Sequence, residues 1–156
     1  MEAVDDAILD LLAKGHTERD FETAVGLLRS VGIQMAPTFV AFTPWTTMEG
    51  YQRMLSRLAE LDLIQNVPPV QYTIRLLVPE GSHLFKLEGF ERLVDDFDPG
   101  LLGYPWRHRD PRVDALQRDL REIVERAEQS DWDRLRTFEA IWRLSLIHIS
   151  EPTRPC

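Results

Sequence analysis

The fold prediction rests on one stretch, Pro37–Gly50, which reads Pro-Thr-Phe-Val-Ala-Phe-Thr-Pro-Trp-Thr-Thr-Met-Glu-Gly. Its apolar part, Phe39–Phe42, consists of residues that favour β-strands. Pro44 cannot donate a backbone hydrogen bond to a neighbouring strand, so it predicts the end of this strand. Thr46 and Glu49 have the spacing of a capping box, which predicts the start of a helix. A strand that turns directly into a helix indicates an α/β fold.

The corner between the predicted strand and helix is the first candidate for a binding site. Thr43, Trp45 and Thr46 would lie at the carboxyl end of the strand, beside the amino end of the helix. Folds of the α/β class place their ligands at this position. The alternative is an ordinary strand–helix connection that binds nothing.

A second strand is predicted at Val70–Val78, where apolar and polar residues alternate. Its apolar side chains would share one face, and its polar ones, including Arg75, the other. We expect it to pair in parallel with Ile33–Phe42, with the helix Met48–Leu63 crossing between them. The order of elements predicts the C-terminal part of a partial TIM-like β/α barrel, followed by C-terminal helices, with the polar strand face lining the lumen.

Three regions are predicted along the chain. Residues 1–83 would form the late β/α units of the barrel, and residues 84–143 a C-terminal helical extension. Residues 144–156 resemble the translation of a sequencing adapter, so we expect a non-native tail with little contact to the rest. A genuine C-terminal strand is the alternative for this tail.

Composition and charge narrow the class of protein. The chain has 156 residues, of which 44% are hydrophobic and 28% charged, as expected for one globular core. Its formal net charge of −8 argues against nucleic acid as a partner, because phosphates require a positive surface. No apolar run approaches the length of a membrane span and no leader is visible, so we expect a cytoplasmic protein that binds no membrane. Cys156 is the single cysteine, which excludes disulfides and a thiolate metal site.

Several motifs together resemble the radical SAM superfamily. They are Glu2–Leu9, the Lys-Gly-His-Thr turn at Lys14–Thr17, and the Phe-Thr-Pro-Trp-Thr-Thr corner at Phe42–Thr47. In that corner, Phe42 and Thr46 depart from the commonest family pattern. The corner, with Gln71–Ser82 and Tyr104–His108, is most similar to the radical SAM proteins named for a CUAEP or CCAEP tail. The similarity covers roughly Glu2–Arg143 and contains no motif as specific as a metal-ligand set.

The resemblance implies an enzyme whose barrel holds a [4Fe–4S] cluster and S-adenosylmethionine. Three cysteines of a Cys-x3-Cys-x2-Cys loop hold the cluster, and cleavage of the cofactor gives a radical that abstracts a substrate hydrogen. This chain lacks that loop. We therefore expect a middle-to-C-terminal fragment that contributes part of the cofactor and substrate pocket, retains neither cofactor alone, and is inactive alone. The substrate would be a small molecule or a peptide of unknown identity.

Five residues carry this expectation. Glu2 would approach the amino group of the cofactor, or else belong to a frayed chain end. Thr43 and Thr46 would donate hydrogen bonds to cofactor or substrate, or Thr46 would only cap the helix. Trp45 would stack on the adenine, or pack on its own corner. Arg75 would bind the methionyl carboxylate, or form a structural ion pair with an acid such as Glu2. No residue is predicted to bind a metal.

Two other functions compete with the radical SAM reading. One is a small, self-contained α/β domain that binds a ligand or a partner without catalysis. The other is a different β/α barrel enzyme that recognises a phosphate at its strand ends. A phosphate site is expected to show a glycine-rich loop at the start of a helix, and this sequence has none.

Overall fold

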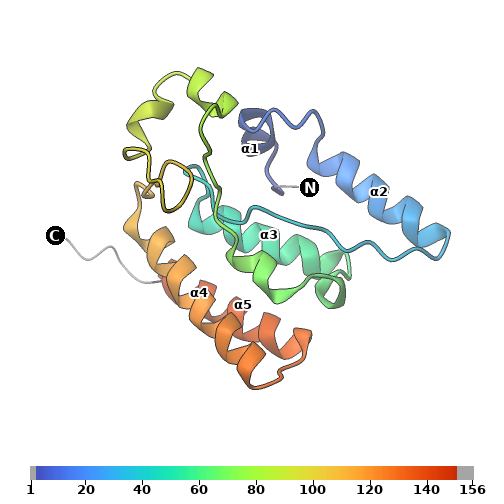
Figure 1. Ribbon diagram of the computed structural model, residues 1–156. Helices are drawn as coiled ribbons and strands as arrows, with labels where there is room; N and C mark the ends of the chain where they lie inside the picture. The colour runs from blue at the N-terminus through green and yellow to red at the C-terminus, as the bar shows by residue number, and fades with distance from the viewer. Residues whose placement is uncertain (1–2, 151–156) are drawn as a thin grey trace.

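The computed structural model describes residues 3–150, and this part of the chain is mainly helical. Figure 1 shows α3 running through the middle of the molecule, with α1 and α2 on one side and the α4–α5 pair on the other. The elements in chain order are α1 (Asp6–Leu11), α2 (Glu18–Ser30), α3 (Met48–Glu60), η1 (Ile64–Asn66), η2 (Pro69–Thr73), η3 (His83–Lys86), η4 (Phe90–Arg92), α4 (Pro111–Gln129) and α5 (Arg134–Ser150), where η marks a 3₁₀-helix.

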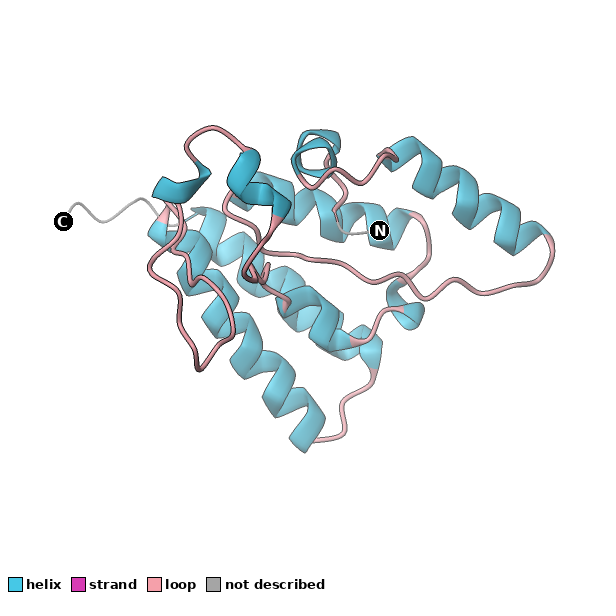
Figure 2. Cartoon of the chain, turned by 45° about the horizontal axis from the view of Figure 1, so that its top comes forward, coloured by secondary structure: helices cyan, strands magenta, loops and turns pink. Residues whose placement is uncertain are grey.

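The predicted α/β barrel is wrong. Figure 2 shows helices and loops with no strand in the described part of the chain, and only isolated β-bridges occur there. The two predicted strands do lie side by side and parallel, but at a single bridge between Phe42 and Arg75. The Phe42 N–H donates to the Ile74 carbonyl over 3.0 Å, and the Leu76 N–H donates to the Phe42 carbonyl over 2.8 Å. One bridge supplies too few ladder bonds to form a sheet.

The start of the predicted second strand is a helix instead, because two prolines precede it. Pro69 begins η2, where its fixed backbone angle suits the first turn of a helix. The Thr73 hydroxyl then donates to the Val70 carbonyl over 2.9 Å, which closes the turn. Tyr72 and Thr73 are both buried while Val70 is 52% exposed, so the alternation of faces predicted for a strand is lost.

The helix starts follow the capping residues in the sequence. The Asp5 carboxylate accepts from the first-turn amides of α1, and Thr17 forms a capping box with Asp20 at α2. Asp110 caps α4, with Pro111 at the first helical position. These side chains accept hydrogen bonds from first-turn amides that otherwise lack a partner within the helix.

The core forms around the apolar face of α3. The residues of this face are almost fully buried: Met48, Tyr51, Met54, Leu55 and Leu58. Helix α3 packs on α5, which packs on α4. On the other side, Arg53 of α3 pairs with Asp5 over 2.6 Å, and Arg57 of α3 pairs with Glu18 of α2 over 2.9 Å. Each fully buried large apolar side chain contributes about 1.5–3 kcal/mol to stability, so this stripe holds the helices together.

The predicted tail, Leu144–Cys156, was expected to make little contact, and its described part contradicts this. It continues α5, where Ser145 is fully buried and donates to the Gln52 side chain over 3.0 Å. The His148 ring is 8% exposed and lies 2.9 Å from the Asp119 carboxylate. The α5 register places both residues toward the rest of the molecule. Cys156 lies outside the described residues.

Candidate ligand-binding site around Arg75

Four of the five predicted site residues lie in the described chain, and Glu2 lies outside it. The Phe42–Arg75 bridge brings Arg75 close in space to the corner that holds Thr43, Trp45 and Thr46. The predicted site residues of the described chain therefore lie in the same part of the molecule. What each side chain contacts decides whether that region can bind a ligand.

The two threonine hydroxyls of the corner bind each other and the backbone. The Thr46 hydroxyl accepts from the Thr43 N–H over 2.9 Å and donates to the Ala41 carbonyl over 3.2 Å. The two hydroxyl oxygens lie 3.0 Å apart, and Thr43 also accepts from the Trp45 N–H over 3.2 Å. Both side chains are almost fully buried, at 0% and 4% exposure. They therefore stabilise the corner and do not present free hydroxyls to a ligand.

Thr47, rather than Thr46, caps α3. Its hydroxyl accepts from the Gly50 N–H over 2.9 Å, so the predicted capping box of Thr46 and Glu49 is wrong by one residue. The physical reason is that the Thr46 hydroxyl already serves the corner. Adjacent threonines before a helix can each cap it, so spacing alone could not separate them.

Trp45 packs against the chain itself. Its half-buried ring lies 5.9 Å from the ring of Phe90 in η4, at a tilt of 33°. Phe90 in turn contacts Phe85, and Phe85 contacts Tyr104. The tryptophan is therefore one end of an aromatic cluster that joins the corner to η3 and η4.

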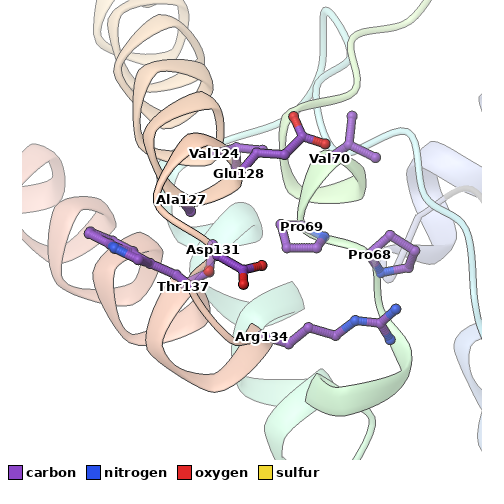
Figure 3. A pocket seen from close by; sticks show the side chains of 10 residues that line it. Pro68, Pro69, Val70, Val124, Ala127, Glu128, Asp131, Arg134 and Thr137 are labelled. Carbon is purple, nitrogen blue, oxygen red and sulfur yellow. The ribbon is translucent and has the colours of Figure 1, made fainter.

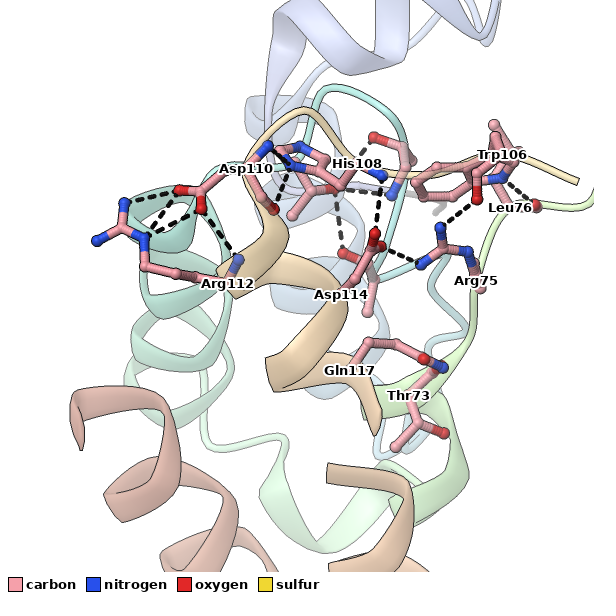
Figure 4. A network of polar contacts seen from close by, with 12 residues as sticks. Thr73, Arg75, Leu76, Trp106, His108, Asp110, Arg112, Asp114 and Gln117 are labelled. Atoms are coloured by element: carbon pink, nitrogen blue, oxygen red, sulfur yellow. Dashed lines mark hydrogen bonds and ion pairs between the residues drawn. The ribbon is translucent and has the colours of Figure 1, made fainter. Parts of the chain in front are cut away.

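Arg75 is held by two partners from distant parts of the sequence (Figure 4). One guanidinium nitrogen donates to the Asp114 carboxylate over 2.7 Å, and another donates to the Trp106 carbonyl over 2.6 Å. The centre of the guanidinium lies 3.5 Å above the Trp106 ring, which adds a cation–π contact. The structure thus shows an ion pair, with Asp114 of α4 as its acid.

The network around Arg75 ties α4 to the loops that precede it. The second oxygen of Asp114 accepts from the His108 N–H over 3.0 Å, and the Trp106 indole N–H donates to the Leu76 carbonyl over 2.8 Å. Three residues along the same helix, Gln117 donates to the Thr73 carbonyl over 3.0 Å. Residues three apart lie on one face of a helix, so this polar face was visible in the sequence although its partner was not.

Asp110 supports the same region from the start of α4. Two guanidinium nitrogens of Arg112 donate to its carboxylate, over 2.6 to 3.0 Å, and the Arg112 N–H donates to it over 3.0 Å. The side-chain bonds from Arg112 hold the pKa of Asp110 below its ordinary value, and the backbone bond acts in the same direction. Asp110 thus stays ionised and keeps its capping role at neutral pH.

An open hollow of about 520 Å³ lies beside this network. It is lined by Arg75, Trp106, Asp114, Gln117, Arg118, Arg121, Glu122 and Glu125. Its α4 wall carries both cations and acids, and the pair Arg121–Glu125 is 3.7 Å apart. A strongly charged ligand would be attracted by some of these side chains and repelled by others. Mixed charge of this kind is typical of a solvent-exposed helix face and not of a ligand site.

A second pocket lies away from Arg75, between η2 and the turn that joins α4 to α5 (Figure 3). It does not correspond to any site expected from the sequence, because no local signal relates Pro68 and Pro69 to the α4–α5 turn.

The described part of the chain shows neither a metal-binding cluster nor a membrane-crossing helix. Within residues 3–150, no three side chains of His, Cys, Asp or Glu come together as a metal site would require. None of the described helices has both the length and the apolar content of a membrane crossing.

Comparisons of the chain with models of known protein families, with curated proteins and with solved structures find no match.

Proposed function

We propose that this chain is a segment of a radical SAM protein and forms a structural wall beside its reaction site. The sequence motifs at Lys14–Thr17, Phe42–Thr47 and Tyr104–His108 support the proposal. The observation that carries it furthest is the bridge between Phe42 and Arg75, which brings two of the family-like regions together. A small-molecule or peptide substrate and a cytoplasmic location belong to the same proposal, and the net charge of −8 supports partners other than nucleic acid.

The described residues do not themselves fit the cofactors of that family. A [4Fe–4S] cluster needs thiolate ligands, and the chain has one cysteine. The Thr43 and Thr46 hydroxyls bind each other, and Arg75 already has Asp114 as its carboxylate. S-adenosylmethionine would have to displace that acid to bind Arg75. We therefore assign no reaction step to this chain.

The DNA that encodes the chain provides the direct test. An in-frame Cys-x3-Cys-x2-Cys motif upstream of Met1 is the expected result, and a stop codon or an unrelated domain there would refute the proposal. A second test is anaerobic reconstitution of the chain with iron and sulfide. We expect no stoichiometric cluster, also when Cys156 is replaced by Ser.

An interaction domain is the second candidate, now helical instead of α/β, and an exposed apolar surface favours it. The residues of this surface are Leu77, Phe85, Phe97, Leu101 and Leu102, with exposures from 36% to 72%. The Tyr104 ring joins two of them, at 4.8 Å from Phe85 and 5.3 Å from Phe97. Six acidic residues and two of Lys or Arg lie between residues 77 and 106. The charge therefore favours a basic amphipathic segment of another protein as the partner.

Two synthetic helical peptides test this candidate, one of Leu and Lys and one of Leu and Glu. We expect only the Leu/Lys peptide to bind, and Leu101→Ser to weaken that binding about tenfold, or about 1.4 kcal/mol. Leu27→Ser is the matched control, because Leu27 of α2 is similarly exposed, at 64% against 58% for Leu101. Equal binding of both peptides, or equal effects of the two variants, would refute a specific surface.

A further inference from the structure

The pocket between η2 and the α4–α5 turn has apolar walls and a volume of about 270 Å³. Its apolar side is formed by Pro68, Pro69, Val70, Val124 and Ala127. Val124 and Ala127 are buried, at 9% and 3% exposure, whereas Val70 is open to solvent. The volume lies just below the usual range for drug-sized ligands, about 300–1,000 Å³, so a small ligand would fit.

Three charged side chains surround this apolar space. Figure 3 shows Glu128 in the last turn of α4, Asp131 in the turn that follows it and Arg134 at the start of α5, all extending toward the segment of the two prolines. Arg134 donates a hydrogen bond to the Gln65 carbonyl, which holds its guanidinium at the pocket. Among the described residues, neither acid lies within ion-pair distance of Arg134 or of another cation. The pocket therefore presents both signs of charge without neutralising them internally.

A buried hydroxyl near Arg134 is also without a partner. Tyr72 is 1% exposed, and within residues 3–150 its phenolic oxygen has no hydrogen-bond partner. Burial raises the pKa of this phenol, and the positive charge of Arg134 acts against that rise, as expected if the two groups are close. Buried polar groups usually have partners, so this hydroxyl is an exception, although Tyr72 does not itself line the pocket.

We propose that this pocket binds a small zwitterion with an apolar body, of the α-amino-acid class. The carboxylate would face Arg134, the ammonium would face Glu128 and Asp131, and the apolar side chain would lie against Pro69 and Val124. A guanidinium and a carboxylate form the strongest charged hydrogen bonds available to such a ligand.

A ligand with a single charge fits this pocket less well. A simple amine would satisfy the acids but leave Arg134 without an anion, and a simple carboxylate would leave Glu128 and Asp131 without a cation. An internal peptide segment carries neither terminal charge. The zwitterion is the class that pairs all three side chains while burying apolar surface.

Titration of the full chain with L-leucine, followed in ¹⁵N NMR spectra, tests the proposal. We expect saturable shifts of backbone amides at Ala127–Thr137, with millimolar affinity. N-acetyl-leucine lacks the ammonium and leucinamide lacks the carboxylate, and each is expected to bind at least tenfold more weakly. No shifts with leucine, or equal affinity for the three compounds, would overturn the proposal.

Charge-neutral variants locate the two ends of the ligand. Arg134→Gln should abolish the preference for leucine over leucinamide, and Asp131→Asn should reduce the preference over N-acetyl-leucine. Arg143→Gln on α5 and Glu125→Gln on α4 are matched exposed controls outside the pocket and should change neither preference. If Arg134→Gln fails to fold, the Asp131→Asn variant and the binding of N-acetyl-leucine and leucinamide to the unchanged protein still test the proposal. Equal effects of site and control variants would overturn the proposal.

Discussion

Removing the acid that holds Arg75 should destabilise the fold by an amount that the geometry bounds. Asp114 accepts from Arg75 over 2.7 Å and from the His108 N–H over 3.0 Å. The Arg75 and Asp114 side chains are 28% and 29% exposed, so solvent screens the pair only in part. A hydrogen bond to a charged group contributes about 1.5–3 kcal/mol, and a neutral one about 0.5–1.5 kcal/mol. Asp114→Asn should therefore lower the free energy of unfolding by about 1 kcal/mol.

Asp114→Ala should have the larger effect, about 2–3 kcal/mol, because it leaves both Arg75 and the His108 N–H without their acceptor. Urea unfolding followed by circular dichroism measures both variants. With a slope of about 1–3 kcal/mol per molar urea, the alanine variant should shift the midpoint by about 1 M. Glu122→Ala is the matched control on the same helix, and we expect a change within about 0.5 kcal/mol.

A double-mutant cycle with Arg75→Gln isolates the ion pair from the other contacts of each residue. The coupling energy should be about 1 kcal/mol and should decrease only slightly in high salt, since the pair is half-buried. A coupling energy near zero, or Asp114→Ala as mild as Glu122→Ala, would refute the structural role assigned to this pair.

Three further predictions test other contacts. Thr46→Val should lower the free energy of unfolding by about 2–3 kcal/mol, because it removes the partner of the Thr43 N–H in a buried corner. Thr47→Val removes only a helix cap and should lower it by about 1 kcal/mol. Equal losses for the two variants in urea unfolding would contradict the corner geometry. Tyr51→Phe removes a hydrogen bond of 3.0 Å to the Tyr72 carbonyl and should cost about 1 kcal/mol, while Tyr72→Phe removes an unpartnered hydroxyl and should be neutral or stabilising in thermal unfolding. Burial holds the pKa of both phenols well above the ordinary value, so the stability of the fold should fall as the pH rises above about 10. Phenolate absorbance from Tyr51 and Tyr72 should appear only when the chain unfolds. Ionisation of either phenol in the folded chain would contradict its burial.

Local signals in the sequence account for where several helices start and which face of α3 is buried. Asp5, Thr17 and Asp110 cap three helices, and the apolar residues of Met48–Leu58 recur at helical spacing on the buried face of α3. These features depend on residues within one or two turns of each other. The sequence alone is therefore sufficient to predict them.

The barrel prediction failed where the outcome depended on distant partners. The alternation in Val70–Val78 is typical of a strand, but a strand needs neighbours along its length, and only Phe42 forms a bridge with this segment. Pro69 then favoured a 3₁₀-helix over the first half. The β-preference of individual residues is weak compared with the effect of neighbouring strands and of proline.

The contacts of the candidate site residues depend on partners that the sequence does not indicate. Arg75 was identified as a cation that requires an acid, which was physically correct. Its acid is 39 residues further along the chain, in Asp114, and no local pattern relates the two. The pocket beside Pro69 was missed for the same reason, because its walls come from η2 and from the α4–α5 turn.

The central claim is that Arg75 is held inside the chain by Asp114 and Trp106 and is not free to bind a cofactor. Proton NMR of the Arg75 side chain tests this directly, because its guanidinium lies 3.5 Å above the Trp106 ring. We expect ring-current shifts to high field for the Arg75 side-chain protons and nuclear Overhauser contacts between them and the Trp106 ring. Arg75 signals at the positions of an unstructured chain, without those contacts, would contradict it.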